Sequence, residues 1–257
     1  MDVMPTFESF DGLQLNYSLW EGSGSARPVV LQHGFAADTN ANWISTGVVG
    51  ALRKAGFTVI SLDARGHGRS EKPHDEARYG EDSMVRDVSA LLDELGLAEV
   101  SLVGYSMGAI IALAATAADP RIRCLATGGV GSGIVDFGGV DLRVVKPAEI
   151  ASALLAEDAS LVPAAGAPFR QLADILGGDR RALAAVALAA REGSLDLSAI
   201  NVPTLILAGD QDLLAAEPER LAAAIAGARL VRIPGDHMTA VTSPAFAQSL
   251  VTFLSAL

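Results

Sequence analysis

A serine between two glycines stands where a run of strand character changes into a run of helical character. Val100–Val103 is a short apolar run typical of a buried strand. Ala109–Ala118 contains no Gly or Pro and is followed by an Asp-Pro pair, as expected of a buried helix that ends there. The residues Gly104–Gly108, with the sequence Gly-Tyr-Ser-Met-Gly, join the two. Because backbones that turn this sharply come very close, only glycine fits two positions either side of Ser106. The sequence therefore predicts a tight turn that exposes the Ser106 hydroxyl, and an ordinary helix N-cap serine is the alternative.

A reactive serine needs a base, and the base needs an acid that orients it. The chain has four histidines, and His237 is the one that follows Ser106. It comes after the short strand predicted at Arg229–Ile233, on a loop. In a strand-turn-helix architecture with the chain order serine, acid, histidine, His237 is therefore the candidate base.

Two carboxylates follow the strand predicted at Thr204–Ala208, within Gly209-Asp210-Gln211-Asp212. Asp210 comes directly after a glycine, where a short carboxylate is well placed to bind backbone N–H groups. Asp212 lies past the turn and can reach the loop that carries His237. Asp236 is adjacent to His237, and neighbouring side chains on a loop usually diverge. We therefore favour Asp212 as the acid, with Asp210 as the alternative.

The chain resembles the α/β-hydrolase superfamily over nearly its whole length. Besides Ser106 in its turn and His237 near the C-terminus, the match includes His33-Gly34-Phe35 after the strand Val29–Gln32. It also includes Asp63–Ser70, which is similar to the Asp-x-Arg-Gly-x-Gly-x-Ser loop of the branch that contains esterases, lactonases and haloperoxidase-like enzymes.

The resemblance implies a role for each matching residue. It implies a catalytic triad of Ser106, Asp212 and His237, since members of the superfamily place the acid three residues after the glycine that ends this strand. It further implies an oxyanion hole formed by the backbone N–H groups of Phe35 and Met107. His33 and His67 are assigned to the scaffold.

Two positions depart from the commonest pattern. Many relatives have Pro where this chain has Ala36, so we expect a less rigid oxyanion loop, and many have a second Gly where it has Ala109. The nucleophile is Ser rather than Asp, which argues against the haloalkane dehalogenase and epoxide hydrolase relatives.

Alternating runs predict an α/β fold: a doubly wound, mostly parallel sheet with an N-terminal antiparallel hairpin and a helical cap insertion. The hairpin is predicted from Thr6–Phe10 and Leu13–Trp20. The other predicted strands are Val29–Gln32, Thr58–Leu62, Val100–Val103, Ile122–Ala126, Thr204–Ala208 and Arg229–Ile233. The predicted helices are Val48–Ala55, Ser83–Leu95, Met107–Ala118, Glu219–Ala226 and Pro244–Leu254.

The predicted core comprises residues 1–127 and 200–257, and residues 128–199 form the predicted cap. No strand is evident in the cap, but helices are predicted at Pro147–Glu157, Pro168–Leu176 and Arg180–Arg191. Its opening run, Gly128–Gly133, is either a hinge or a set of packing glycines. Arg143, Lys146 and Arg170 are candidate anchors for a substrate carboxylate, although solvated charges on helix faces are the commoner case.

Composition restricts the possible partners. A net charge of −11 argues against binding to nucleic acid and to anionic membrane surfaces. Cys124 is the single cysteine, so no disulfide can form within the chain, and we expect it to be buried in a strand. No apolar run approaches the roughly 20 residues of a membrane helix, and Met1–Pro5 lacks the features of a secretion signal, so we expect a cytoplasmic protein.

These features predict a serine hydrolase that cleaves a carboxylic ester or lactone of a small, largely apolar substrate through an acyl-enzyme. We expect no cofactor and no metal, and the oligomeric state is open. The same triad would serve a carbon–carbon bond hydrolase or a cofactor-free perhydrolase. A small-molecule receptor built on a hydrolase fold is the alternative outside enzymes.

Overall fold

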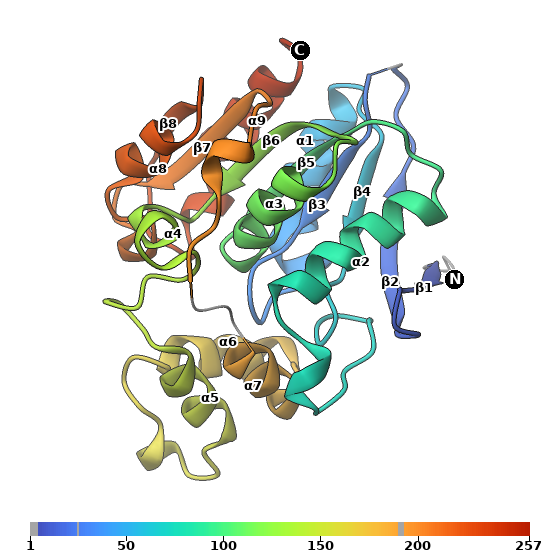
Figure 1. The fold of residues 1–257 in the computed structure, drawn as a ribbon. Helices are drawn as coiled ribbons and strands as arrows, with labels where there is room; N and C mark the ends of the chain where they lie inside the picture. The colour runs from blue at the N-terminus through green and yellow to red at the C-terminus, as the bar shows by residue number, and fades with distance from the viewer. Residues whose placement is uncertain (1–4, 25, 190–192) are drawn as a thin grey trace.

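An eight-stranded sheet forms the centre of the molecule in the computed structural model, which describes residues 5–24, 26–189 and 193–257 (Figure 1). The strand order is β1-β2-β4-β3-β5-β6-β7-β8. The strands are β1 Thr6–Glu8, β2 Gln14–Trp20, β3 Val29–Gln32, β4 Val59–Leu62, β5 Val100–Tyr105, β6 Ile122–Gly128, β7 Thr204–Gly209 and β8 Arg229–Ile233. β1 pairs with β2, and β2 with β4, in the antiparallel sense, whereas every other neighbouring pair is parallel. The predicted fold class is confirmed.

Helices cover both faces of the sheet, as the alternation of strands and helices requires. On one face α2 (Glu81–Glu94), α3 (Met107–Ala118) and α8 (Pro218–Ala224) pack against side chains from β3 to β7. On the other face α1 (Val48–Lys54) and α9 (Pro244–Leu254) cover a second apolar cluster. Buried strands with apolar residues on both faces explain why the strand runs show no alternation. Cys124 is buried in β6, as expected.

A separate group of helices lies at one end of the molecule, apart from those that flank the sheet (Figure 1). It contains α5 (Pro147–Leu155), α6 (Ala167–Leu176) and α7 (Arg180–Leu188), which we call the cap helices. They have their own apolar cluster, which includes Leu154 and Leu183. No helix within the described ranges is long and apolar enough to cross a bilayer.

The structure adds an element that the sequence did not predict. α4 (Ser132–Phe137) follows the glycine run, and it packs against α8, where Asp136 pairs with Arg220 at 2.6 Å. α4 therefore lies with the core rather than with the cap helices. The predicted helix from Arg180 ends at Leu188, and its predicted residues 190 and 191 lie outside the described residues, as do residues 1–4.

Short helical turns complete the chain. A π-helical turn spans Asn40–Ile44. The 3₁₀ turns are Glu76–Arg78, Ala159–Leu161, Leu197–Ala199, Leu213–Ala215 and Ala240–Thr242.

Candidate active site

Ser106 occupies the turn between β5 and α3 in a strained conformation. Its φ is 54° and its ψ is −118°, in the region that non-glycine residues rarely adopt. A Cβ on Gly104 would lie 2.1 Å from the Gly108 carbonyl oxygen, and a Cβ on Gly108 would lie 2.0 Å from the Gln32 carbonyl oxygen. Both contacts are impossible for a side chain, so both glycines are needed for this turn, as the sequence indicated.

His237 joins Ser106 to Asp212. Its Nε2 lies 2.9 Å from Ser106 Oγ, and its Nδ1 lies 2.9 Å from Asp212 Oδ2 and 3.0 Å from Oδ1. A carboxylate only accepts hydrogen bonds, so Nδ1 carries the proton and Nε2 is left to accept the serine hydroxyl. The Asp212 side chain is fully buried, and Oδ1 also accepts the N–H groups of Leu214 and Ala215. These bonds fix both the carboxylate and the imidazole in place.

The two other carboxylates near His237 bind backbone instead. Asp210 accepts the Gly235 N–H at 2.9 Å. Asp236 accepts the hydroxyl and N–H of Thr239 and the N–H of Met238, and these bonds lower the pKa of Asp236 below its usual value. The structure thus brings Asp212 to the imidazole and leaves Asp210 and Asp236 in their own turns.

The loop that begins at His33 brings Gly34, the residue before Phe35, beside Ser106, since a Cβ on Gly34 would lie 3.4 Å from Ser106 Cβ. The Ala37 N–H donates to the Gly34 carbonyl at 3.2 Å, which closes a turn with Ala36 at a φ of 57°. Proline is locked near −65° and cannot adopt that angle. Ala36 is also buried, so the loop is closed and packed, and its expected lower rigidity stays a prediction.

Met107 supplies the other candidate donor. It is the first residue of α3, where backbone N–H groups have no acceptor within the helix. Phe35 and Met107 both line the cavity beside Ser106.

His33 and His67 lie behind this loop and bond to backbone. His33 Nε2 accepts the Ala64 N–H at 3.0 Å, and its Nδ1 donates to the Gly34 carbonyl. His67 donates from Nδ1 to the Arg65 carbonyl. Burial, reinforced by the nearby His33, lowers the pKa of His67 to about 3, so the ring stays neutral in the fold.

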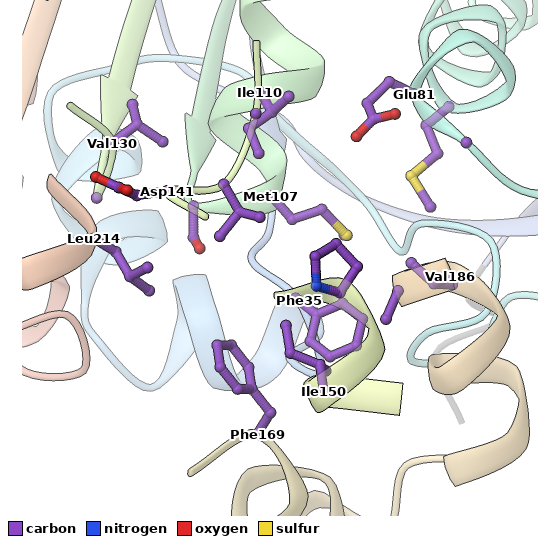
Figure 2. Close-up of a pocket in the computed structure, with 18 residues that line it drawn as sticks. Phe35, Glu81, Met107, Ile110, Val130, Asp141, Ile150, Phe169, Val186 and Leu214 are labelled. Atoms are coloured by element: carbon purple, nitrogen blue, oxygen red, sulfur yellow. The ribbon is translucent and has the colours of Figure 1, made fainter. Parts of the chain in front are cut away.

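Two compartments open on either side of Ser106. The first is shown in Figure 2, with Phe35, Ile150 and Phe169 on one side and Ile110 and Glu81 on the other. The second contains His237 and Asp236 and extends past Asn42 to Leu172 of α6. Both compartments are lined mainly by apolar side chains, and both are bounded partly by cap residues.

The glycine run between β6 and α4 packs tightly. A Cβ on Gly129 would lie 3.1 Å from His237 Cε1, and one on Gly131 would lie 2.2 Å from the Ala216 carbonyl oxygen. These contacts favour the packing alternative over the hinge.

The candidate substrate anchors of the cap are engaged with protein atoms. Arg143 binds Asp141 at 2.7 Å and also Ser132. Arg170 binds Asp174 and the carbonyls of residues 153 and 156. Lys146 is exposed. In the described part of the chain, the lining of neither compartment includes Arg143, Lys146 or Arg170.

Two residues with evident supporting contacts, Tyr105 and Asn42, were missed by the sequence reasoning. Tyr105 donates its hydroxyl to the His237 carbonyl at 2.7 Å, and Asn42 Oδ1 accepts the Gly34 N–H at 2.8 Å. Phe169 contacts Phe35 edge to face. Tyr105 could have been suspected from its place beside Ser106, but no local pattern marks Asn42. Within the described ranges no three His, Cys, Asp or Glu side chains are grouped as a metal site requires.

Comparison with known proteins relates both the sequence and the fold to one superfamily. A family model described as alpha/beta hydrolase fold matches residues 27–134. The sn-1-specific diacylglycerol lipase ABHD11 of Xenopus tropicalis is 36% identical over 111 residues, which is 43% of this chain and 33% of that protein. The non-heme chloroperoxidase CPO-A1 of Kitasatospora aureofaciens is 37% identical over 105 residues, 41% of this chain and 35% of that protein. The match thus spans about a third of the length of these curated relatives.

Solved structures match over the whole chain. A hydrolase from Pseudomonas aeruginosa PA01 superposes with a TM-score of 0.78 at 28% identity, covering 98% of each chain. The enol-lactonase from Burkholderia xenovorans LB400 has a TM-score of 0.74 at 28% identity, covering 98% of this chain and 100% of that one. The sheet order and these matches identify the α/β-hydrolase fold, and together with the strained serine turn they support the α/β-hydrolase superfamily.

Proposed function

We propose that the protein is a serine hydrolase that cleaves a carboxylic ester or lactone of a small, largely apolar substrate through an acyl-enzyme. The observation that carries the proposal is the continuous chain of hydrogen bonds from Asp212 through His237 to Ser106, which ends beside an apolar cavity. The enol-lactonase fold neighbour supports the same class of reaction.

The first half of the reaction acylates the serine. Ser106 Oγ attacks the substrate carbonyl carbon while His237 Nε2 takes the hydroxyl proton. The backbone N–H groups of Phe35 and Met107 stabilise the negative charge that develops on the carbonyl oxygen, and losing one such donor typically costs about 10²–10³ in kcat. The C–O bond then breaks, and His237 gives its proton to the departing alcohol.

The second half of the reaction removes the acyl group and regenerates the free serine. Water attacks the acyl carbon, His237 accepts one of its protons, and the serine leaves with that proton as the carboxylic acid forms. Asp212 keeps the imidazole in the tautomer that both halves require. The chain's own residues complete this cycle, which consumes one water and yields an acid and an alcohol from an open-chain ester, or one hydroxy acid from a lactone.

A fluorophosphonate probe tests the proposal, because it reacts with an activated serine. The wild type should be labelled at Ser106 and should hydrolyse p-nitrophenyl esters, whereas Ser106→Ala should do neither. Ser83→Ala, in α2 and outside the lining given for either compartment, is the matched control and should keep both. Labelling that persists in Ser106→Ala would move the nucleophile elsewhere. Labelling without ester turnover would instead support the receptor alternative.

A further inference from the structure

Four residues line both compartments and therefore mark the boundary between them. They are Phe35, Ser106, Phe169 and Leu214. Phe35 belongs to the core loop and Phe169 to α6, and their rings meet edge to face with centroids 5.9 Å apart. Figure 2 shows the two rings side by side at the edge of the first compartment. We call these two rings the Phe35–Phe169 wall. It separates the two compartments and ends at Ser106.

The position of the base gives the two compartments different roles. In the described structure, His237 lines the second compartment and does not line the first. Because His237 must protonate the departing alcohol oxygen, that oxygen has to face the second compartment. The acyl group bonded to Ser106 is then directed into the first compartment.

The compartments differ in size and in lining. The volume of the first is about 90 Å³ and that of the second about 510 Å³. The first is surrounded by apolar side chains from the core and the cap, including Ile110, Ile150 and Val186. Two carboxylates, Glu81 and Asp141, also line it, and Asp141 is bound by Arg143. A small apolar acyl group therefore suits the first compartment, and a bulkier alcohol suits the second.

We propose that the protein prefers open-chain esters of a small apolar acid with a bulkier alcohol, and that Phe169 is the specificity-determining residue that keeps the two groups apart. This inference rests on the proposed serine hydrolase function. A lactone is disfavoured because its acyl and alcohol carbons belong to one ring, which would have to lie on both sides of the Phe35–Phe169 wall.

The test uses two series of esters that carry no p-nitrophenyl group. Hydrolysis is measured by the release of acid. One series lengthens the acyl group on a fixed alcohol, and the other enlarges the alcohol of a fixed acetate. For the wild type we expect kcat/KM to fall about tenfold or more per methylene once the acyl compartment is full, since one methylene in a tight pocket is worth about 10–200-fold. Enlarging the alcohol should change kcat/KM little, and simple lactones should be poor substrates.

Two matched large-to-small variants separate the compartments. Ile150 lines the first only and Leu172 the second only, and both belong to the apolar cluster of the cap. Ile150→Ala should extend the accepted acyl length by about one or two methylenes and leave the alcohol profile unchanged, whereas Leu172→Ala should do the reverse. Phe169→Ala should relax both profiles and raise lactone turnover relative to open-chain esters. Ile175→Ala is the control, because this side chain is 70% exposed on the same helix as Phe169.

The inference is wrong if Ile150→Ala changes alcohol selectivity, or if wild-type enzyme cleaves lactones as well as the best open-chain ester. Ile150→Val provides a milder change should the alanine variant fail to fold, and it should shift the acyl profile in the same direction. Failure of the proposed function itself has a different signature, because Ser106 would then resist the fluorophosphonate probe and no ester would be cleaved.

Discussion

The core and the cap helices position atoms around Ser106 by different means. In the core, main-chain geometry fixes the proposed catalytic groups: the turn at Ser106 depends on two glycines, and Asp212 is held by two backbone N–H groups. The cap helices contribute apolar side chains to the cavity walls, such as Ile150 and Phe169. The proposed reacting groups thus all come from the core, whereas the cavity walls come from the core and the cap together.

The packing inside the cap is consistent with this separation. α5 and α7 contact each other through small side chains, including Ala151, Ala184 and Ala187. Small side chains at the contact let the two helices approach closely. The cap helices are thus held to one another by apolar contacts, separate from the hydrogen bonds that hold Asp212.

The largest expected effect concerns Asp212. Asp212→Asn keeps the shape of the side chain but favours the wrong imidazole tautomer, so kcat should fall by about 10⁴, as for the equivalent change in a serine protease. Asp210→Asn, the matched control, keeps an oxygen for the Gly235 N–H and should lose little. Initial rates on several esters measure both.

The same experiment can contradict the assignment of the proposed catalytic groups to the core and of part of the cavity wall to the cap. If chemistry belongs to the core, the loss in Asp212→Asn should be similar for every ester. A loss that varies strongly from ester to ester would mean that cavity shape and proton transfer are coupled. A larger loss in Asp210→Asn would reassign the acid.

The next largest effect is a change in the free energy of unfolding with pH. It concerns the core, because residues 147–188, which contain the cap helices, include no histidine. His67 has a pKa of about 3 in the fold, below the 6.5 of an exposed histidine, so the unfolded chain binds more protons between these values. The stabilisation is complete above pH 6.5 and is lost as pH falls toward 3. Between pH 6.5 and 4 the wild type should lose about 2–3 kcal/mol from this group.

Urea unfolding at pH 7 and pH 4 measures that loss. His67→Asn retains a donor for the Arg65 carbonyl but does not titrate, so its stability should depend less on pH in this range. His74→Asn, at an exposed histidine, is the matched control for removing an imidazole. Equal pH dependence in wild type and His67→Asn would show that other groups dominate acid unfolding.

The smallest effect tests how firmly the cap is fastened to the core. His74 in the core lies 2.9 Å from Asp179, the residue that caps α7, and both side chains are substantially exposed. Exposed ion pairs contribute about 0–1 kcal/mol. His74→Ala should therefore lower the free energy of unfolding by no more than about 1 kcal/mol. A loss of several kcal/mol in urea titrations would indicate that the two regions are not separable in this way.

The elements that support the chemistry could be predicted because each leaves a local signature. α3, α9 and β8 have the predicted bounds, since Pro, Gly and capping residues mark their ends. Ser106, Asp212 and His237 all follow strands, and the carboxyl ends of parallel strands meet at one edge of a sheet.

Other features depend on contacts that no local pattern records. α4 has six residues and follows a glycine run, so it lacks the repeating apolar spacing of a longer helix. Asn42 acts through a partner eight residues away, from a π-helical turn. That Phe169 meets Phe35 follows only from the tertiary packing of the cap on the core.

The strands on either side of the cap suggest how such a protein can diversify. β6 and β7 are neighbours in parallel register, from the pair Leu125–Thr204 to the pair Gly128–Leu207, and the whole of α4 to α7 lies between them in sequence. Doubling the length of a flexible connection costs only about 0.6 kcal/mol in loop closure. Segments of different length or sequence can therefore be exchanged at this one point by recombination or by directed evolution, and the sheet that carries the serine, the histidine and the aspartate can be inherited intact.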